Sequence, residues 1–410
     1  MKGLVLEGGG TKGAYHIGAY KALRELGIEF NGVAGTSIGA LNGAFIVQNN
    51  IKMMEDIWEN YDYTSFMDID EETYEKYKNV DFTPKNLNIL IDLMNKARKN
   101  QGIDITPLKK LLEENIDEEA IRNSNKDFGI VTVHWDKKIN PHPLYIEDIP
   151  KGKLADYLIA SASMPIFNLE KIDDKLFLDG MFSDNMPIKL LVEKNYNDIV
   201  VIRLMTDFIG NMNIQKFIDK GINVKVIMPS EPLGGSLNKD KDSVEKNIRL
   251  GYLDTMKAYK RYEGVRYYFN LDYKYDENYC FDKFKNLKNE TIEDLCKVLG
   301  IKRQISRRVL FENIIPRIGE ILDLNKEFTY KELFYAIYEQ KLQENGIKRV
   351  NLYDFSKLLD TVHKNYNINY RTNDYSEENN EAEKLNMTIS KSKLPKVLTN
   401  LIIGDFKNQG

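Results

Sequence analysis

One serine stands between two glycines in the stretch GVAGTSIGALNGA, residues 32–44. Gly35, Ser37 and Gly39 have the Gly-x-Ser-x-Gly spacing that lifts a serine hydroxyl out of a sharp turn between a strand and a helix. The start of a helix also favours the negative charge that develops when a serine attacks a carbonyl carbon. The alternative is a small buried residue that only caps the helix. We interpret Ser37 as a candidate nucleophile.

A second glycine-rich stretch, EGGGTKG, lies one crossover earlier in the chain. The N–H groups of Gly8, Gly9 and Gly10 have no side chains in their way, so they could converge on one anionic oxygen. Lys12 and the positive end of the following helix would strengthen that binding. A turn that binds nothing is the alternative. The nearby serine favours an oxyanion hole.

The same glycines, continued to Gly13, also fit the Gly-x-Gly-x-x-Gly pattern of a dinucleotide site. Such a site needs an acidic residue for the ribose at the end of the second strand, where this chain has GTSIG. A phosphate-binding loop is also excluded, since no Gly-Lys-Ser or Gly-Lys-Thr occurs in the stretch. A nucleotide-binding protein therefore stays a minor alternative.

A serine nucleophile needs a base, and the usual base is a histidine. The four histidines lie in places that offer no partner for Ser37: His16, His134, His142 and His363. A carboxylate is the remaining choice. In LFLDGMFSDNMPI, Asp179 ends a strand at Gly180, where parallel sheets display their functional groups. The alternative for Asp179 is an ordinary Asp-Gly turn.

Three blocks in this order, GGGTKG at 8–13, GTSIG at 35–39 and DGM at 179–181, resemble the signature blocks of the patatin-like phospholipase family. The resemblance is to bacterial acyl hydrolases of that family, which use a Ser-Asp dyad without histidine. SASMPIF at 161–167 and DNMPI at 184–188 agree with it. The matching segments span roughly residues 1–260.

The resemblance implies that Ser37 is the nucleophile and Asp179 its base. It makes the N–H groups of three glycines the oxyanion hole, with five further residues in supporting positions: Gly8, Gly9 and Gly10, then Lys12, Gly13, Gly35, Gly39 and Gly180. This chain departs from the family pattern at Met181, where Gly or Ala is usual. Because Ala is accepted there, Met181 raises a question of space and not of backbone conformation.

The activity that the resemblance implies is lipid acyl hydrolysis of the phospholipase A or lysophospholipase type. Ser37 would form an acyl-enzyme from a phospholipid or another fatty acyl ester, and the scheme requires no metal and no cofactor. A catalytically degenerate lipid-binding or regulatory protein on the same fold is the alternative function.

Composition sets limits on partners and location. The chain has 62 acidic and 58 basic residues, so its charge gives no reason to expect a nucleic-acid partner. Cys280 and Cys296 are too few for a disulfide framework. No histidine or further cysteine stands beside them at the spacing of a metal site. No apolar run approaches the length of a membrane span. We expect a cytoplasmic protein that contacts the membrane surface transiently.

The elements that must position Ser37 and Asp179 follow from alternating strand-like and helix-like patterns. Strands are predicted at residues 3–7, 32–35, 128–135, 175–180, 198–205 and 222–229. A helix after the glycine loop has its buried face at i, i+3, i+4 and i+7: Ala19, Ala22, Leu23 and Leu26. The predicted fold is α/β, a patatin-like three-layer arrangement with a central, mostly parallel sheet flanked by helices.

The patterns change in the last third of the chain. We assign residues 1–272 to the acyl hydrolase domain and residues 273–370 to a mainly helical accessory module, in which Thr329 and Glu332 form a capping box. The acidic stretch at residues 371–383 is predicted to be a flexible linker, and residues 384–410 a helical tail. No feature of the module identifies its protein partner.

Overall fold

The computed structural model describes residues 1–60, 62, 66, 70–79, 103–136, 138–165, 167, 171–206, 208–238, 240–302, 304–365 and 393–409. The chain divides into two compact units, Met1–Ala258 and Tyr259–Gly410. Each unit has its own cluster of buried apolar side chains. The sequence places this boundary later, after residue 272.

The first unit is built around a sheet with the strand order β5-β6-β3-β2-β1-β7-β8, and β4 lies beside β3. Neighbouring strands from β3 through β2, β1 and β7 to β8 run parallel, whereas β4 and β6 run antiparallel to β3. The strands are β1 (Lys2–Leu6), β2 (Gly32–Thr36), β3 (Asp127–Asp136), β4 (Lys138–Tyr145), β5 (Lys171–Ile172), β6 (Lys175–Asp179), β7 (Asp198–Ile202) and β8 (Asn223–Ile227).

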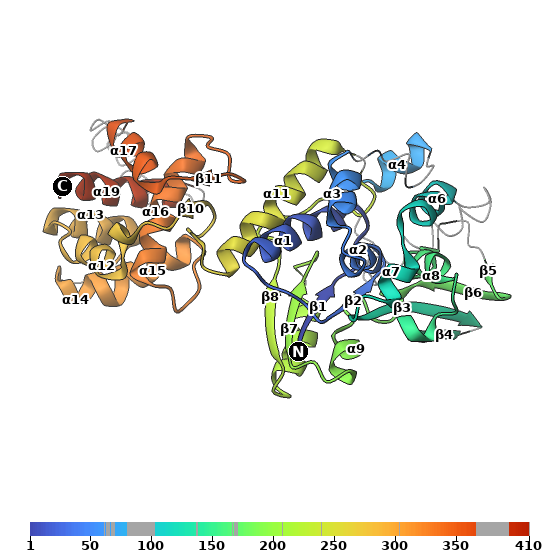
Figure 1. The fold of residues 1–410 in the computed structure, drawn as a ribbon. Helices are drawn as coiled ribbons and strands as arrows, with labels where there is room; N and C mark the ends of the chain where they lie inside the picture. Colours follow the sequence, from blue (N-terminus) through green and yellow to red (C-terminus); the bar gives the residue numbers. More distant parts are fainter. Residues whose placement is uncertain are drawn as a thin grey trace. The chain divides into compact units, whose positions relative to one another are not determined.

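Helices cover both faces of this sheet (Figure 1). On one face, Val5 and Val201 pack with Leu190 of α9 and Ile214 of α10. On the other face, α2 lies against β1 and β2. The helices of this unit are α1 (Ala14–Glu25), α2 (Ile38–Val47), α3 (Ile51–Glu59), α4 (Glu71–Tyr77), α6 (Thr106–Asn115), α7 (Glu118–Arg122), α8 (Leu154–Ser161), α9 (Ile188–Glu193), α10 (Phe208–Ile218) and α11 (Lys241–Ala258). The predicted three-layer α/β fold is confirmed.

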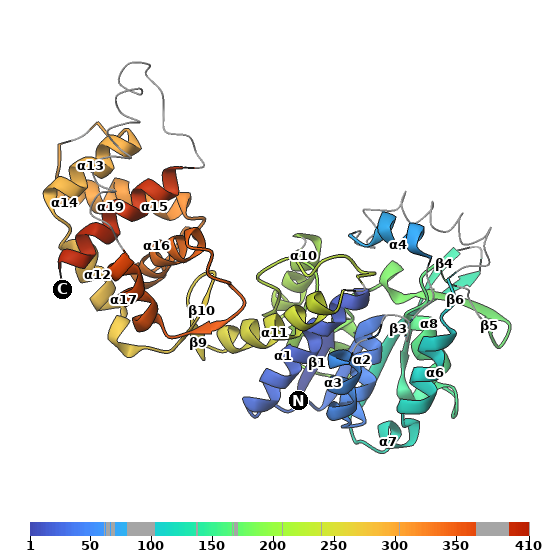
Figure 2. The same cartoon turned by 90° about the horizontal axis from the view of Figure 1, so that it is seen from above.

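The first helix forms as its sequence pattern predicts. A short 3₁₀ turn, η1 (Gly10–Gly13), leads directly into α1, whose predicted face is buried at Ala19, Ala22 and Leu23. The helix ends at Glu25 with Leu26 as its C-cap, and Gly27 follows with a φ of 71°. Helix α1 lies beside α11 in both views (Figure 2), and Tyr15 Oη donates a hydrogen bond to Asp254 at 3.0 Å.

Strand β3 is the template that brings β2 and β6 together. Along one edge of β3, Val131 pairs with Thr36 of β2, and the next residue, Thr132, pairs with Asp179 of β6. Because β2 runs parallel and β6 antiparallel to β3, their carboxyl ends meet. Strand β4 occupies the opposite edge of β3 and was not predicted. Its two prolines suit an edge strand, where an N–H group need not pair.

The second unit is mainly helical, with a small sheet of β9 (Tyr262–Glu263), β10 (Tyr268–Asn270) and β11 (Leu352–Tyr353). The predicted capping box of Thr329 and Glu332 is confirmed at the start of α16. Its helices are α12 (Glu277–Lys285), α13 (Asn289–Leu299), α14 (Arg307–Val309), α15 (Ile315–Ile321), α16 (Tyr330–Glu344), α17 (Phe355–Asn365) and α19 (Leu394–Asn408). The predicted linker at 371–383 lies outside the described residues, as does the first part of the predicted tail.

Candidate active site

Ser37 lies on the turn between β2 and α2 with a backbone conformation that a serine rarely adopts. Its φ is 55° and its ψ is −128°. Its N–H donates a hydrogen bond to Ser161 Oγ at 3.0 Å, and Ser161 Oγ donates in turn to the Val131 carbonyl at 2.6 Å. These bonds hold a strained turn, which is typical of a functional site.

The hydroxyl of Ser37 is hydrogen-bonded to the carboxyl group of Asp179. Ser37 Oγ lies 2.7 Å from Asp179 Oδ2, and the N–H of Met181 donates to Asp179 Oδ1 at 2.8 Å. Asp179 has no exposed surface. This burial raises the pKa of its carboxyl group from 3.8 to about 7, because the charged form loses its hydration. The serine hydroxyl therefore lies next to a buried carboxyl group whose pKa is raised to about 7.

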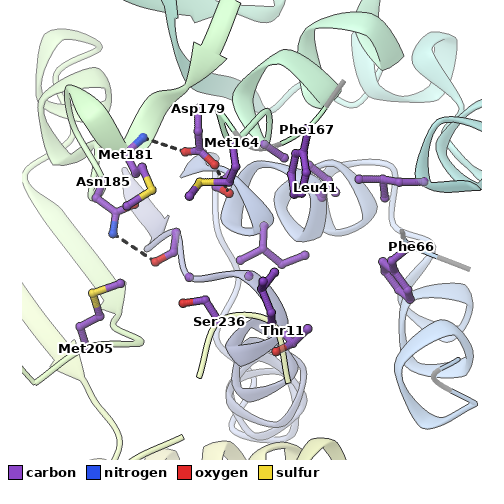
Figure 3. A pocket seen from close by; sticks show the side chains of 18 of the residues that line it. Thr11, Leu41, Phe66, Met164, Phe167, Asp179, Met181, Asn185, Met205 and Ser236 are labelled. Carbon is purple, nitrogen blue, oxygen red and sulfur yellow. Dashed lines mark hydrogen bonds between the residues drawn. The ribbon is translucent and has the colours of Figure 1, made fainter. Parts of the chain in front are cut away.

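Ser37 and Asp179 open onto one pocket with about 740 Å³ of empty space, part of it open to solvent (Figure 3). Most of the wall is apolar. The lining side chains include Ile38, Leu41, Trp58, Phe66, Leu108, Phe167, Leu237 and the methionines Met164, Met181 and Met205. Such a wall suits a hydrocarbon chain.

The glycine loop forms another part of the wall, with Gly8, Gly9 and Gly10. The N–H of Gly8 donates to the Asn185 carbonyl at 3.1 Å, so it is already engaged, and the expectation that Gly8 contributes to an oxyanion hole needs correction. Across the described chain, the N–H groups of Gly9 and Gly10 have no hydrogen-bond acceptor. Gly10 has a φ of 61°, and a Cβ there would overlap the Ser236 carbonyl oxygen.

The supporting residues lie around the pocket without all reaching it. Lys12 is buried in η1, and Gly13 caps the start of α1, with its carbonyl accepting from Asn42 Nδ2 at 3.1 Å. Neither is among the described residues that line the pocket. Gly180 follows Asp179, where a Cβ would overlap the Val131 carbonyl oxygen. Lys12 therefore does not form part of the described pocket wall.

Residues 4–192 match the model of the family described as "Patatin-like phospholipase". This part of the chain is a patatin-like phospholipase domain. Its family assignment places it in a class of lipid acyl hydrolases.

Curated relatives of the patatin domain share a short segment with it. The neuropathy target esterases sws of Drosophila melanogaster and Drosophila persimilis are each 62% identical to this chain over 42 residues. That segment covers 10% of this chain and 3% of each relative, so the chain spans a small part of their length. Among solved structures, VipD from Legionella pneumophila has a TM-score of 0.41 and 14% identity, over 100% of this chain and 85% of VipD.

None of the four histidines bonds to Ser37 or Asp179 of the patatin domain in the described structure. His16 is fully buried beside Asn42, and burial lowers the pKa of its imidazole to about 3. His134 and His142 flank the ring of Phe177, and His363 lies in the second unit. The described residues also hold no cluster of three or more His, Cys, Asp or Glu side chains suited to a metal ion.

Sequence reasoning missed Glu7, which precedes the glycine loop. Its buried carboxylate accepts from the N–H groups of Leu204 and Met205 at 2.6 and 3.0 Å, and it lies 3.4 Å from the guanidinium group of Arg203. These bonds tie the loop to the segment that follows β7. A charged residue at the end of a buried strand is the signal that could have revealed it.

Proposed function

We propose that the patatin domain hydrolyses carboxylic ester bonds of phospholipids or other fatty acyl esters, with Ser37 as nucleophile and Asp179 as base. The observation that carries the proposal is the 2.7 Å hydrogen bond between Ser37 Oγ and Asp179 Oδ2 at the edge of an apolar pocket. The family assignment supports the class of reaction, and the pocket supports a substrate with a long hydrocarbon chain.

The first half of the proposed reaction forms an acyl-enzyme. Ser37 Oγ attacks the ester carbonyl carbon while Asp179 takes the hydroxyl proton. The carbonyl oxygen becomes an oxyanion and accepts hydrogen bonds from the N–H groups of Gly9 and Gly10. When this tetrahedral intermediate collapses, its bond to the alcohol oxygen breaks and Asp179 returns the proton to the leaving alcohol. The acyl chain is then esterified to Ser37.

The second half releases the fatty acid. A water molecule attacks the acyl carbon of Ser37 while Asp179 accepts a proton from that water. The same N–H groups stabilise the second oxyanion. Collapse of this intermediate breaks the bond to Ser37 Oγ, and Asp179 returns its proton to that oxygen. The products are the free acid and the regenerated serine.

The environment of Asp179 supports its role as a base. A carboxyl group with a pKa near 4 takes a proton from an alcohol poorly. Burial raises the pKa of Asp179 to about 7, and Met181 N–H keeps the carboxylate oriented. Its other oxygen is left to receive the serine proton.

Lipid esters reside in membranes or micelles, so the proposed activity requires transient contact with a lipid surface. Among the described residues, no helix has both the length and the apolar character needed to cross a bilayer. We expect the protein to sediment with phospholipid vesicles at low salt. If it stays in the supernatant under all conditions, a dispersed ester is the better substrate class.

The direct test is fatty acid release from phospholipid vesicles by the wild type, Ser37→Ala and Asp179→Asn. We expect release by the wild type and a fall of about 10³-fold or more in both variants, because each removes one half of the dyad. Ser183→Ala is the matched control, since Ser183 is an exposed serine on the turn after Asp179. Equal release by Ser37→Ala and the wild type would rule out the proposed nucleophile. A folded wild type that releases nothing would favour the lipid-binding alternative.

A further inference from the structure

The apolar part of the pocket runs along helix α2. In Figure 3, Leu41 and Phe66 lie on the same side of Asp179. Ser37 caps the start of α2, and Ile38 and Leu41 of this helix line the same pocket. Because residues three positions apart lie above one another on a helix, Ile38 and Leu41 form one apolar strip. An acyl chain esterified to Ser37 would follow this strip towards the second turn of α2.

The ring of Trp58 lies beside that second turn. Its Nε1–H donates a hydrogen bond to Asn42 Oδ1 at 3.1 Å, and Asn42 directly follows Leu41. The ring of Phe66 lies 5.9 Å away, centre to centre, and both rings line the pocket. Since each helical residue adds about 1.5 Å, Asn42 lies roughly 7 Å further along the axis of α2 than Ser37. The two rings therefore lie beside the pocket at a distance along α2 that an acyl chain reaches.

A buried network fixes the orientation of the Trp58 ring. Asn42 is 2% exposed, and its Nδ2 donates to the Gly13 carbonyl at 3.1 Å and lies 3.3 Å from His16 Nδ1. The side-chain amide is therefore oriented with Oδ1 facing the indole N–H group, which can only donate. Trp58 also belongs to the buried face of α3 and is 3% exposed. A ring held by its packing and by this hydrogen bond is a fixed wall of the pocket.

We propose that Trp58 is the stop for the acyl chain and sets how much of a fatty acyl group the pocket takes up. This inference rests on the proposed function and adds a chain-length limit to it. Each methylene group that enters the apolar pocket should raise kcat/KM up to about fourfold, because it leaves water. Beyond the Trp58 ring, further methylene groups stay outside this stretch and add nothing. Asn42 is a positioning residue, which acts on the chain only through Trp58.

The test measures kcat/KM for p-nitrophenyl butyrate, octanoate, dodecanoate and palmitate in micelles of one detergent. In the wild type, kcat/KM should rise with chain length and level off before palmitate. Trp58→Ala removes the ring and should raise the ratio of the palmitate value to the octanoate value by about 10-fold or more. Trp58→Phe keeps a smaller ring that preserves the packing, and it should raise the same ratio by less. Trp135→Ala is the matched control, because Trp135 lies on β3 and is not among the described residues that line the pocket. It should keep the wild-type ratio.

Asn42→Ala tests the positioning role separately. It leaves the indole ring in place but removes its hydrogen-bond acceptor, so the ratio should rise by less than in Trp58→Ala. In a chain that already carries Trp58→Ala, the same substitution should leave the ratio unchanged, because no ring is left to position. A further change of the ratio in that double variant would overturn the positioning role of Asn42.

The remaining outcomes separate this inference from the proposed function. If Trp58→Ala and Trp58→Phe lower all four kcat/KM values by the same factor, the ring has a structural role, and the stop is overturned while the hydrolase stands. The stop is also overturned if the wild-type values rise steadily through palmitate. A folded wild type that cleaves none of the four esters and no phospholipid would overturn the function and the inference together.

Discussion

At the scale of single residues, the most informative group is Asp179. A carboxyl group without exposed surface, hydrogen-bonded to a serine hydroxyl and to one backbone N–H, holds its proton up to a pH of about 7. Burial is the main cause, and the two hydrogen bonds act in the opposite direction. Both the activity and the stability of the protein should therefore depend on pH through this group.

The pH dependence of activity follows from the base role. Asp179 must be deprotonated to accept the serine proton, so kcat/KM should rise with pH through an apparent pKa near 7 and then level off. At pH 5 the value should be about 100-fold below the plateau. Initial rates on a soluble short-chain ester, measured between pH 5 and 9, give this profile. A flat profile over that range would contradict the assignment of Asp179 as base.

The same pKa predicts a change in stability. The unfolded chain releases the Asp179 proton near pH 4 and the folded chain near pH 7, so stability falls as pH rises through that window. Asp179→Asn removes this penalty and should raise the free energy of unfolding at pH 8 by up to about 4 kcal/mol. At pH 5 the gain should be less than half as large. Urea denaturation of both proteins at the two pH values measures it, and an equal gain at both would exclude the linkage.

At the scale of elements, the site depends on the close approach of α2 to the end of β1. Gly39 is in the first turn of α2, and a Cβ at this position would overlap the backbone carbonyl oxygen of Leu6. Gly43, one turn later, faces side chains instead, with the nearest atom of Phe128 3.2 Å from such a Cβ. The backbone carbonyl of Leu6 cannot rotate away from an added methyl group, whereas the side chain of Phe128 can adjust.

Two alanine substitutions on α2 should therefore differ. Gly39→Ala is expected to lower the free energy of unfolding by about 3 kcal/mol or more, because the helix must shift away from Leu6. Gly43→Ala should change it by less than about 1 kcal/mol, since alanine's helix propensity offsets a mild crowding. Thermal unfolding compares the stability of the two variants. Equal effects would show that the close approach of α2 to Leu6 does not limit the stability of the protein.

The same elements show what the sequence could predict. Ser37 and Asp179 were predicted as site residues because each stands in a short motif at the end of a strand, and those strands are confirmed. Gly8 was misassigned because the partner of its N–H is Asn185, which lies far along the chain. Contacts between distant loops leave no periodic pattern in a sequence.

At the scale of the whole molecule, the chain is two units with separate cores. The unit boundary at Ala258 precedes the predicted one because β9 and β10 are too short to give a recognisable strand pattern. The core of the second unit includes the rings of Phe269 and Phe355, 4.9 Å apart. No described residue of this unit lines the pocket around Ser37. The stability of the second unit and the proposed ester hydrolysis by the first unit should therefore be separable.

Glu339 offers a way to separate them. It is fully buried in α16 and accepts hydrogen bonds from the N–H groups of Val265, Arg266 and Tyr267. Glu339→Ala leaves these groups without that acceptor and should destabilise the second unit by about 3 kcal/mol. Differential scanning calorimetry should show one transition at lower temperature, with the rate of ester hydrolysis retained. Glu327→Ala, an exposed residue of the same unit, is the control. A parallel loss of hydrolysis would contradict the separation.

The central claim is that Ser37 is a nucleophile activated by Asp179, and covalent labelling tests it most directly. The protein is treated with a fluorophosphonate, digested, and analysed by mass spectrometry to locate the modified residue. The account predicts one phosphonylated site, Ser37, in the wild type, slower labelling in Asp179→Asn and none in Ser37→Ala. A folded wild type that stays unlabelled, or that carries the label on another serine with Ser37 unmodified, would contradict it.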